Sequence, residues 1–337
     1  MTTADHPVDE DFLRLADPYR RELLAHCYRM LGSVHDAEDL VQETYLRAWR
    51  AYDKFEGRSS LRTWLHRIAT RACLTALEDR GRRPLPTGLG EPSADPTDTL
   101  VERPEVPWLE PIPDAMVGAE QSDPAAIVTS RESLRLALIA ALQHLPPRQR
   151  AVLILRDVLR WRAAEVAEAL DTTTVAVNSI LQRARAQLAE VSPSEDEIVE
   201  PTEPGQRELL DRYVAAFEEY DIAGLVKLFT EDAVWEMPPF TSWYRGAENI
   251  GRLVKAQCPA EGPGDMRLVP AEANGQPAFA MYMRDRADGV HRAFALHVLT
   301  LTGGGIGHVA CFFDVRLFNA FGLPDTLPAG PAVADGP

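Results

Sequence analysis

Two stretches rich in proline and acidic residues divide this chain and limit the folds open to it. One, LPTGLGEPSADPTDTLVERPEVPWLEPIPDAMVGAEQSD, ends at Asp123, and the other, SPSEDEIVEPTEPG, ends at Gly205. Neither has the apolar periodicity of a helix or a strand, so we expect both to be linkers. The chain should therefore fold as three blocks, at residues 11–83, 124–191 and 206–325, joined by linkers at residues 84–123 and 192–205.

The first two blocks have the apolar spacing of helices. In the first block, two of the stripes are Leu40, Val41, Tyr45, Ala48 and Trp49, and Leu61, Trp64, Leu65, Ile68 and Ala72. In the second block a stripe runs from Leu134 to Leu145 and ends before Pro146, since proline disfavours helix at the residue that precedes it. We expect each of these blocks to be an all-α helical domain.

The third block has a different pattern. A helix with Leu209, Tyr213 and Phe217 on one face precedes strand-like runs rich in Phe, Tyr, Val and Met. Turns such as AEANGQP and TGGGIG separate these runs. The sequence thus predicts a multidomain protein, with two all-α domains and a C-terminal α+β domain.

Charge and hydropathy exclude several classes of protein. A formal net charge of -16 argues against indiscriminate nucleic-acid binding, because affinity for the backbone needs clustered Lys and Arg. Any contact with DNA should therefore be local. No apolar run approaches the roughly 18 residues of a membrane span, and the opening MTTADHPVDEDF lacks the layout of a signal peptide. We expect a cytoplasmic protein with no membrane partner.

The cysteines carry no metal-site signature. Cys27, Cys73, Cys258 and Cys311 are far apart and include no C-x-x-C pair. We expect buried free thiols, no metal and no cofactor.

A helix-turn-helix pattern lies within residues 162–188. Ala167 is small where two helices must cross, and Asp171 at the turn tolerates the left-handed conformation. The outer face of the second helix would suit a major groove, with Thr173, Thr174, Asn178, Ser179, Gln182, Arg183 and Arg185. The alternative is that its arginines only solvate a surface helix.

The first block supplies a second basic face. The helix expected from Ser60 to Arg80 places Arg62, Thr63, His66, Arg67, Thr70 and Arg71 opposite Trp64, which suits a phosphate track. The preceding loop offers Phe55, Arg58 and Ser59 to a flipped base. Trp64 could also stack on an unpaired base, but it shares a stripe with Leu61 and Ile68, so we expect it in the core.

An acidic helix precedes this loop. It opens with Asp36, Asp39, Leu40, Gln42 and Glu43, and acids in a first turn favour a helix N-terminus. Plain helix capping explains the charge but not the whole combination.

These segments resemble a known family. HDAEDLVQETYLRAWRAYDKFEGRSSLRTWLHRIATRACL resembles sigma-70 region 2, and LQHLPPRQRAVLILRDVLRWRAAEVAEALDTTTVAVNSILQRARAQL resembles region 4. Their order, without regions 1 and 3, is typical of the extracytoplasmic-function sigma factors. The third block resembles the SnoaL-like branch of the nuclear-transport-factor-type fold, a curved sheet closed into a cone, through LLDRYVAAFEEYDIAGLVKLFTEDAVWEMPP and YRGAENIGRLV.

The resemblance implies a role in transcription initiation. The partners would be the RNA polymerase core, through its beta-prime clamp and beta flap, and promoter DNA. The helix at Asp36 to Glu43 would dock on the clamp, Phe55 to Arg71 would read the -10 element, and Thr173 to Arg185 would read the -35 element. The acidic linker would thread the polymerase channel, and the C-terminal domain would modulate activity. Trp108-Leu109-Glu110-Pro111 resembles a linker motif of such proteins, whereas Thr302 to Gly305 is only a loose echo of their Asp-Gly-Gly-Gly-Lys motif.

The C-terminal domain could also carry a pocket. Its candidate lining residues are Trp235, Met237, Trp243, Tyr244, His297 and Asp314. A meeting of His297 with Asp314 would permit acid-base chemistry, but a satisfied core histidine is the commoner outcome, so we expect no enzyme. Two alternatives stay open: a sensor for a small apolar molecule, and a SnoaL-like enzyme fused to a DNA-binding regulator.

Overall fold

The computed structural model describes residues 7–78, 80–117, 132–191 and 204–328. The chain forms two compact units. The helical unit comprises the described parts of residues 1–83 and 109–193, and the sheet unit those of residues 84–108 and 194–337. None of the described helices is long and apolar enough to cross a membrane.

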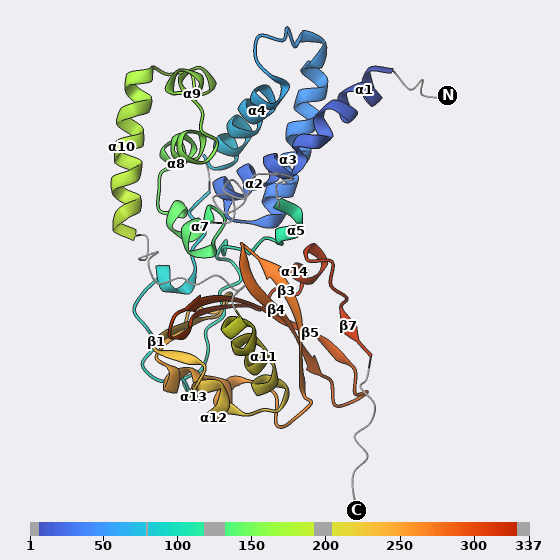
Figure 1. Ribbon diagram of the computed structural model, residues 1–337, viewed down its shortest axis with the longest axis vertical. Coiled ribbons are helices and arrows are strands. Elements are labelled where there is room, and N and C mark those ends of the chain that lie inside the picture. Colours follow the sequence, from blue (N-terminus) through green and yellow to red (C-terminus); the bar gives the residue numbers. More distant parts are fainter. Residues whose placement is uncertain (1–6, 79, 118–131, 192–203, 329–337) are drawn as a thin grey trace, which may run out of the picture. The chain divides into compact units, whose positions relative to one another are not determined.

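The helical unit is built from short and medium helices (Figure 1). They are α1 (Pro7–Ala16), α2 (Arg20–Leu31), α3 (Val34–Ala51), α4 (Leu61–Ala76), α5 (Asp114–Val117), α7 (Leu136–Gln143), α8 (Pro147–Leu153), α9 (Ala163–Ala169) and α10 (Thr174–Val191), with a π-helical turn at Ile154–Val158. Their boundaries follow local chemistry. Gly32 ends α2 with φ +70°, and Ser33 caps α3 by accepting a hydrogen bond from the Asp36 N–H.

Buried arginines join the two predicted helical blocks within this unit. Arg150 of α8 donates to the Met30 carbonyl of α2 and to Gln143 Oε1. Arg29 donates to Ser133 Oγ at 2.7 Å. Burial lowers the pKa of Arg29 and of Arg150 to about 10. Because buried charged groups are costly without hydrogen bonds, the Arg150 contacts hold α8 against α2, and the Arg29 contact holds α2 against Ser133.

The sheet unit is an α+β fold, as the sequence predicts. Its strands are β1 (Phe229–Glu236), β2 (Trp243–Arg245), β3 (Met266–Ala273), β4 (Gln276–Arg284), β5 (His291–Thr302), β6 (Gly305–Phe312) and β7 (Thr326–Leu327). They form one mixed sheet of order β2-β1-β6-β5-β4-β3, with β7 beside β5, in which β1 and β6 run parallel. The helices are α11 (Pro204–Glu218), α12 (Ile222–Val226), α13 (Ala247–Gln257) and α14 (Arg316–Ala320).

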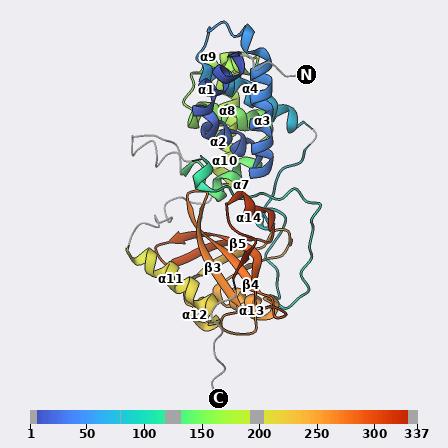
Figure 2. The ribbon, with the colours of Figure 1, turned by 90° about the vertical axis from the view of Figure 1, so that its right-hand side faces the viewer.

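The core of the sheet unit lies between the sheet and its helices. Figure 2 shows α11 and α12 beside the sheet, and Tyr213 and Phe217 of α11 pack on Phe279, Trp235 and His297 of the strands. The predicted turn at Asn274-Gly275 joins β3 to β4 with positive φ at both residues. Gly305 has φ +132°, and a Cβ there would lie 2.5 Å from the Leu228 carbonyl oxygen, so only glycine fits this turn.

The long stretch predicted as a linker is divided between the units. Residues 84–108 belong to the sheet unit, whereas Leu109 and the residues after it belong to the helical unit. Within that second part, Asp114–Val117 forms α5. Residues 118–123 of the predicted linker lie outside the described residues, and in residues 84–117 the absence of periodicity gives no sign of where the segment binds.

Candidate functional sites

The N-terminus of α3 is held by the Trp-Leu-Glu-Pro segment. Glu110 accepts hydrogen bonds from Ser33 Oγ at 2.6 Å and from His35 Nδ1 at 2.9 Å, while Tyr28 donates to the Glu110 carbonyl. Burial raises the pKa of Glu110, but the hydrogen bonds from His35 and Ser33 outweigh it, so the net shift is downward. This carboxylate therefore stays ionised beside the helix N-terminus, where negative charge is favoured.

The predicted polymerase-binding residues of α3 have different surroundings. Asp39 and Gln42 are exposed, and Leu40 and Glu43 are half-buried. Asp36 forms ion pairs with Arg80 and Arg83. The sequence places Trp49 on the inward stripe, but Leu46 and Trp49 are 49% and 44% exposed. An outward strip of Asp39, Gln42, Leu46 and Trp49 thus runs along α3.

The predicted -10 residues lie on α4 and on the loop before it. Phe55 packs on Trp64 with ring centroids 4.8 Å apart, so this half-buried tryptophan is covered by an aromatic neighbour from the loop. Arg58 is exposed and pairs with Glu56 at 2.5 Å, and Ser59 is half-buried. Among the helix residues, Arg62 pairs with Glu22.

His66 departs from the predicted outer face. It is fully buried, its Nδ1 lies 3.0 Å from the Arg62 carbonyl, and its ring meets His26 and Trp161 at 5.4 and 6.2 Å. Thr70 is fully buried as well. Burial lowers the pKa of His66. His26 and Trp161 cover α4 on a second side, so this face of the helix does not point to solvent.

Two predicted -10 arginines pair with the helix-turn-helix. Arg67 lies 2.7 Å from Glu168 of α9, and Arg71 lies 2.7 Å from Asp171. Arg71 Nε also donates to the Ala169 carbonyl at 3.2 Å. The basic face of α4 is thereby neutralised in part by the second helical block. Thr63 remains half-buried at the start of the helix.

The helix-turn-helix itself has the predicted local structure. Asp171 has φ +49°, and Thr173 Oγ1 accepts from the Ala176 N–H at the start of α10. Val177, Leu181 and Ala184 are buried, whereas all the predicted groove-facing residues are exposed: Thr173, Thr174, Asn178, Ser179, Gln182, Arg183 and Arg185. Arg185 pairs with Asp157 at 2.6 Å.

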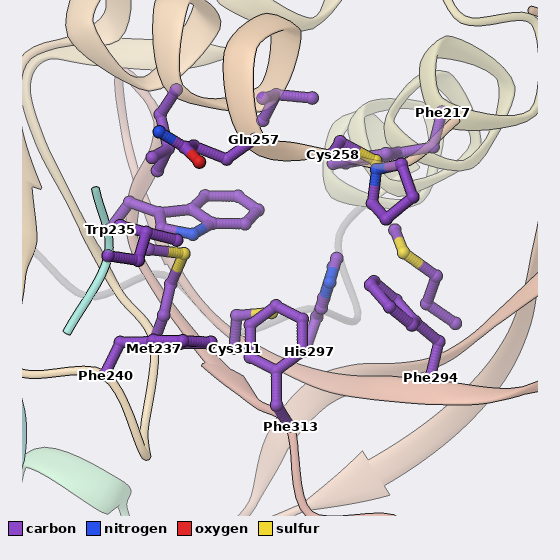
Figure 3. Close-up of a pocket in the computed structure, with 15 residues that line it drawn as sticks. Phe217, Trp235, Met237, Phe240, Gln257, Cys258, Phe294, His297, Cys311 and Phe313 are labelled. Atoms are coloured by element: carbon purple, nitrogen blue, oxygen red, sulfur yellow. The ribbon is translucent and has the colours of Figure 1, made fainter. Parts of the chain in front are cut away.

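The sheet unit contains a largely apolar cavity of about 270 Å³ (Figure 3). Trp235, Met237 and His297 line it, as the sequence predicts. Sequence reasoning did not find most of the wall, which comes from separate elements: Leu100, Phe217, Phe240, Leu253, Val254, Gln257, Cys258, Pro259, Met281, Phe294, Cys311 and Phe313. These residues have no common sequence signal.

The other candidate pocket residues lie elsewhere. Trp243 donates from Nε1 to the Gly90 carbonyl at 2.9 Å, and Asp314 pairs with Arg316 at 2.6 Å. Neither they nor Tyr244 line the cavity. His297 instead bonds Tyr213 at 2.8 Å, and burial lowers its pKa to about 3. The described lining residues include no carboxylate, so the cavity lacks the acid-base pair that the sequence left open.

Residues 84–108, here called the strap, lie along the sheet unit (Figure 1). Three strap N–H groups donate to the sheet unit: Thr87 to Glu236 Oε2, Ser93 to the Trp243 carbonyl, and Arg103 to the Pro239 carbonyl. Four strap carbonyls accept from it: Gly90 from the Trp243 side chain, Pro96 and Asp98 from the Gln257 side chain, and Val101 from the Thr241 N–H. The Asp95 carboxylate accepts from Arg252. Glu236 is fully buried and also meets His308 Nε2 at 2.7 Å. The strap is therefore bound by specific groups, not by charge alone.

The cysteines and acidic residues show no metal-binding arrangement in the described parts of the chain. The four cysteines are unpaired, and no group of three His, Cys, Asp or Glu side chains could hold a metal ion there.

Three known families match the chain. Residues 15–83 match sigma-70 region 2, residues 135–188 match sigma-70 region 4, and residues 210–309 match the SnoaL-like domain. The matches follow the order in which the sequence places these modules.

Whole-chain relatives agree with these matches. The ECF RNA polymerase sigma factor SigG of Mycobacterium tuberculosis is 64% identical over 95% of this chain and 87% of its own length. SigJ of the same organism is 31% identical over 73% of this chain and 72% of its own length. The crystal structure of SigJ superposes with a TM-score of 0.59 and 25% identity over 94% of this chain and all of that one. The chain therefore belongs to the extracytoplasmic-function sigma factors of the sigma-70 family, which makes it a factor that directs RNA polymerase to promoters and not an enzyme.

Proposed function

We propose that this sigma factor reads the -10 element with α4 and its preceding loop and the -35 element with α10, and that its SnoaL-like domain restrains this activity by binding the strap. The observation that carries the proposal is the set of hydrogen bonds along residues 84–108. The strap is the part of the chain between region 2 and region 4, so whatever binds it limits how those regions can separate.

Competition for the strap provides the mechanism. A strap that threads the polymerase channel must first leave Glu236, Trp243 and Gln257 of the sheet unit. Each hydrogen bond lost contributes roughly 0.5–1.5 kcal/mol to the attached state. The domain therefore acts as an internal competitor of polymerase, and its effect is inhibitory.

Ion pairs between α4 and the helix-turn-helix would also restrain DNA binding. Arg67 and Arg71 must exchange Glu168 and Asp171 for phosphates before α4 can bind DNA. Half-exposed ion pairs of this kind contribute only about 0–1 kcal/mol each, so the highly charged backbone of DNA can replace them.

The outward strip of α3 would dock on polymerase. It combines exposed Asp39 and Gln42 with exposed Leu46 and Trp49. Interfaces are enriched in aromatic anchors beside polar rims, which is the composition found here. Reversal of charge through Asp39→Lys should weaken binding to core polymerase by roughly 1–3 kcal/mol, and unchanged binding would rule this strip out.

Promoter-specific transcription with purified core polymerase tests the regulatory proposal. The full chain is compared with a chain that ends at Val191 and with Gln257→Ala, which removes the bonds to the Pro96 and Asp98 carbonyls. The control is Asn249→Ala, because Asn249 lies on the same helix and donates to Arg245 instead of the strap.

We expect the shortened chain and Gln257→Ala to initiate more often than the full chain, by about fivefold for Gln257→Ala. Asn249→Ala should match the full chain. Equal initiation by the full chain, the shortened chain and Gln257→Ala would overturn restraint by the domain. Lower initiation by the two altered chains would make the domain an activator.

A further inference from the structure

We infer that the cavity of the sheet unit binds a small, uncharged, aromatic ligand, and that the bound ligand strengthens attachment of the strap. The inference rests on the proposed function only in the consequence for transcription. Binding itself is read without polymerase or DNA.

The walls of the cavity define the class of ligand. Its deep part consists of buried rings and sulfur-bearing side chains, including Phe217, Trp235, Met281 and Cys311. Its mouth carries the half-buried rings of Phe240, Phe294 and Phe313, which pack edge to face at 5.3–5.5 Å. No charged side chain is among the described lining residues. Aromatic rings and thioethers favour a flat aromatic partner, and a charged one would lose its hydration without compensation.

One polar group in this wall has no partner. Trp235 projects into the cavity (Figure 3), it is 3% exposed, and within the described chain its Nε1–H makes no hydrogen bond. His297 differs because its Nδ1 already bonds Tyr213. The Trp235 nitrogen lies beneath the surface of the cavity, so a ligand meets the apolar ring of Trp235 and not its Nε1–H. The cavity is near the lower end of the usual size range of ligand pockets, which suits a two-ring molecule.

The strap forms part of the cavity wall. Leu100 lines the cavity. Two residues before it, the Asp98 carbonyl accepts a hydrogen bond from Gln257, and two residues after it, the backbone of Glu102 forms a β-bridge with the backbone of Phe240. Gln257 and Phe240 themselves line the cavity. Gln257 through its side chain and Phe240 through its backbone therefore hold the strap, while both residues line the ligand space.

This shared wall couples the two events. The cavity is present with Leu100 in place, so a ligand can enter without displacing the strap. Such a ligand touches Leu100 only while the strap is attached, and it must therefore bind the attached state more tightly. By thermodynamic linkage the ligand strengthens attachment by the same factor by which attachment strengthens ligand binding. The SnoaL-like domain thus becomes a ligand-dependent latch.

The probe for this test is 2-isopropylnaphthalene, with 2-naphthoate as a charged match of similar shape. Binding to the full chain is measured by calorimetry, and amide hydrogen exchange of residues 84–108 is followed with and without probe. We expect 2-isopropylnaphthalene to bind more tightly than the carboxylate, which would lose its hydration in an uncharged cavity, and to slow exchange in the strap by about fivefold. Failure of both compounds to bind, or faster or unchanged exchange with the probe bound, would overturn the inference.

Matched variants locate the effect. Leu100→Ala removes part of the wall and should weaken probe binding roughly fivefold, whereas Leu89→Ala alters an exposed strap leucine outside the cavity and should change nothing. Equal losses in Leu100→Ala and Leu89→Ala would contradict the shared wall. The proposed restraint by the SnoaL-like domain is tested separately, by comparing transcription initiation by the full chain and by Gln257→Ala in the absence of probe.

Discussion

The helices α4 and α10 are both assigned to DNA by the sequence, but the helical unit presents them differently. All seven groove-facing candidates of α10 are exposed. On α4, His66 is buried, while Arg62, Arg67 and Arg71 pair with Glu22, Glu168 and Asp171. The candidate residues of α10 are therefore open to solvent, whereas those of α4 already have partners within the unit.

The largest expected effect concerns His66. Its removal in His66→Ala should lower the free energy of unfolding by about 3 kcal/mol, because a fully buried ring is replaced by a cavity. Urea denaturation of the full chain measures this, with exposed Arg58→Ala as a control expected within about 0.5 kcal/mol of the unaltered protein. Unaltered stability combined with weaker promoter binding would instead mean that the His66 side chain contacts DNA.

The next effect concerns Arg183 of α10. Arg183→Ala should weaken binding of the holoenzyme to a -35 element by about 2 kcal/mol, or roughly thirtyfold, if this exposed arginine contacts a base. Arg185→Ala should have a smaller effect, since Arg185 already pairs with Asp157. Competition binding with a promoter fragment measures both. If Arg183→Ala weakens all DNA sequences equally, Arg183 contacts phosphate and does not read bases.

The burial of His66 on α4 also predicts how the stability of the protein depends on pH. Burial lowers the pKa of His66, so its imidazole is neutral when folded and gains a proton more readily when unfolded. Stability through this group is therefore present above the unfolded pKa of about 6.5 and is lost as the pH falls below it, by up to about 1.4 kcal/mol per pH unit. Denaturation between pH 7 and pH 5 should show this loss, and His66→Ala should show less of it. An identical pH profile for the two proteins would exclude His66 as a source.

The smallest effect concerns the ion pairs between α4 and the helix-turn-helix. Glu168→Gln with Asp171→Asn removes the ion pairs of Arg67 and Arg71, and asparagine keeps the left-handed turn at φ +49°. Stability should change by less than about 1 kcal/mol, while promoter affinity rises by roughly threefold. Glu190→Gln controls for charge alone, because it removes an exposed acid from α10 without these partners. An equal rise with Glu190→Gln would show that general charge, and not release of α4, is responsible.

Local sequence determined the features that depend on near neighbours. The outer face of α10 is exposed as its sequence predicts, and Asp171 takes the expected left-handed turn. The change from helical to strand-like periodicity predicted the α+β domain, and the sigma factor and SnoaL-like resemblances are confirmed by the family matches. Each of these signals is contained within a single element or motif.

Tertiary structure decided what lies between elements. Periodicity marks one apolar stripe, so it could not show that α4 is covered on a second side at His66, or that Trp49 faces outward. It also could not bring Leu100 of an aperiodic stretch to the cavity or direct Trp243 toward Gly90. Contacts between residues more than a hundred positions apart depend on how strands and helices pack, and spacing along the chain carries no information about that packing.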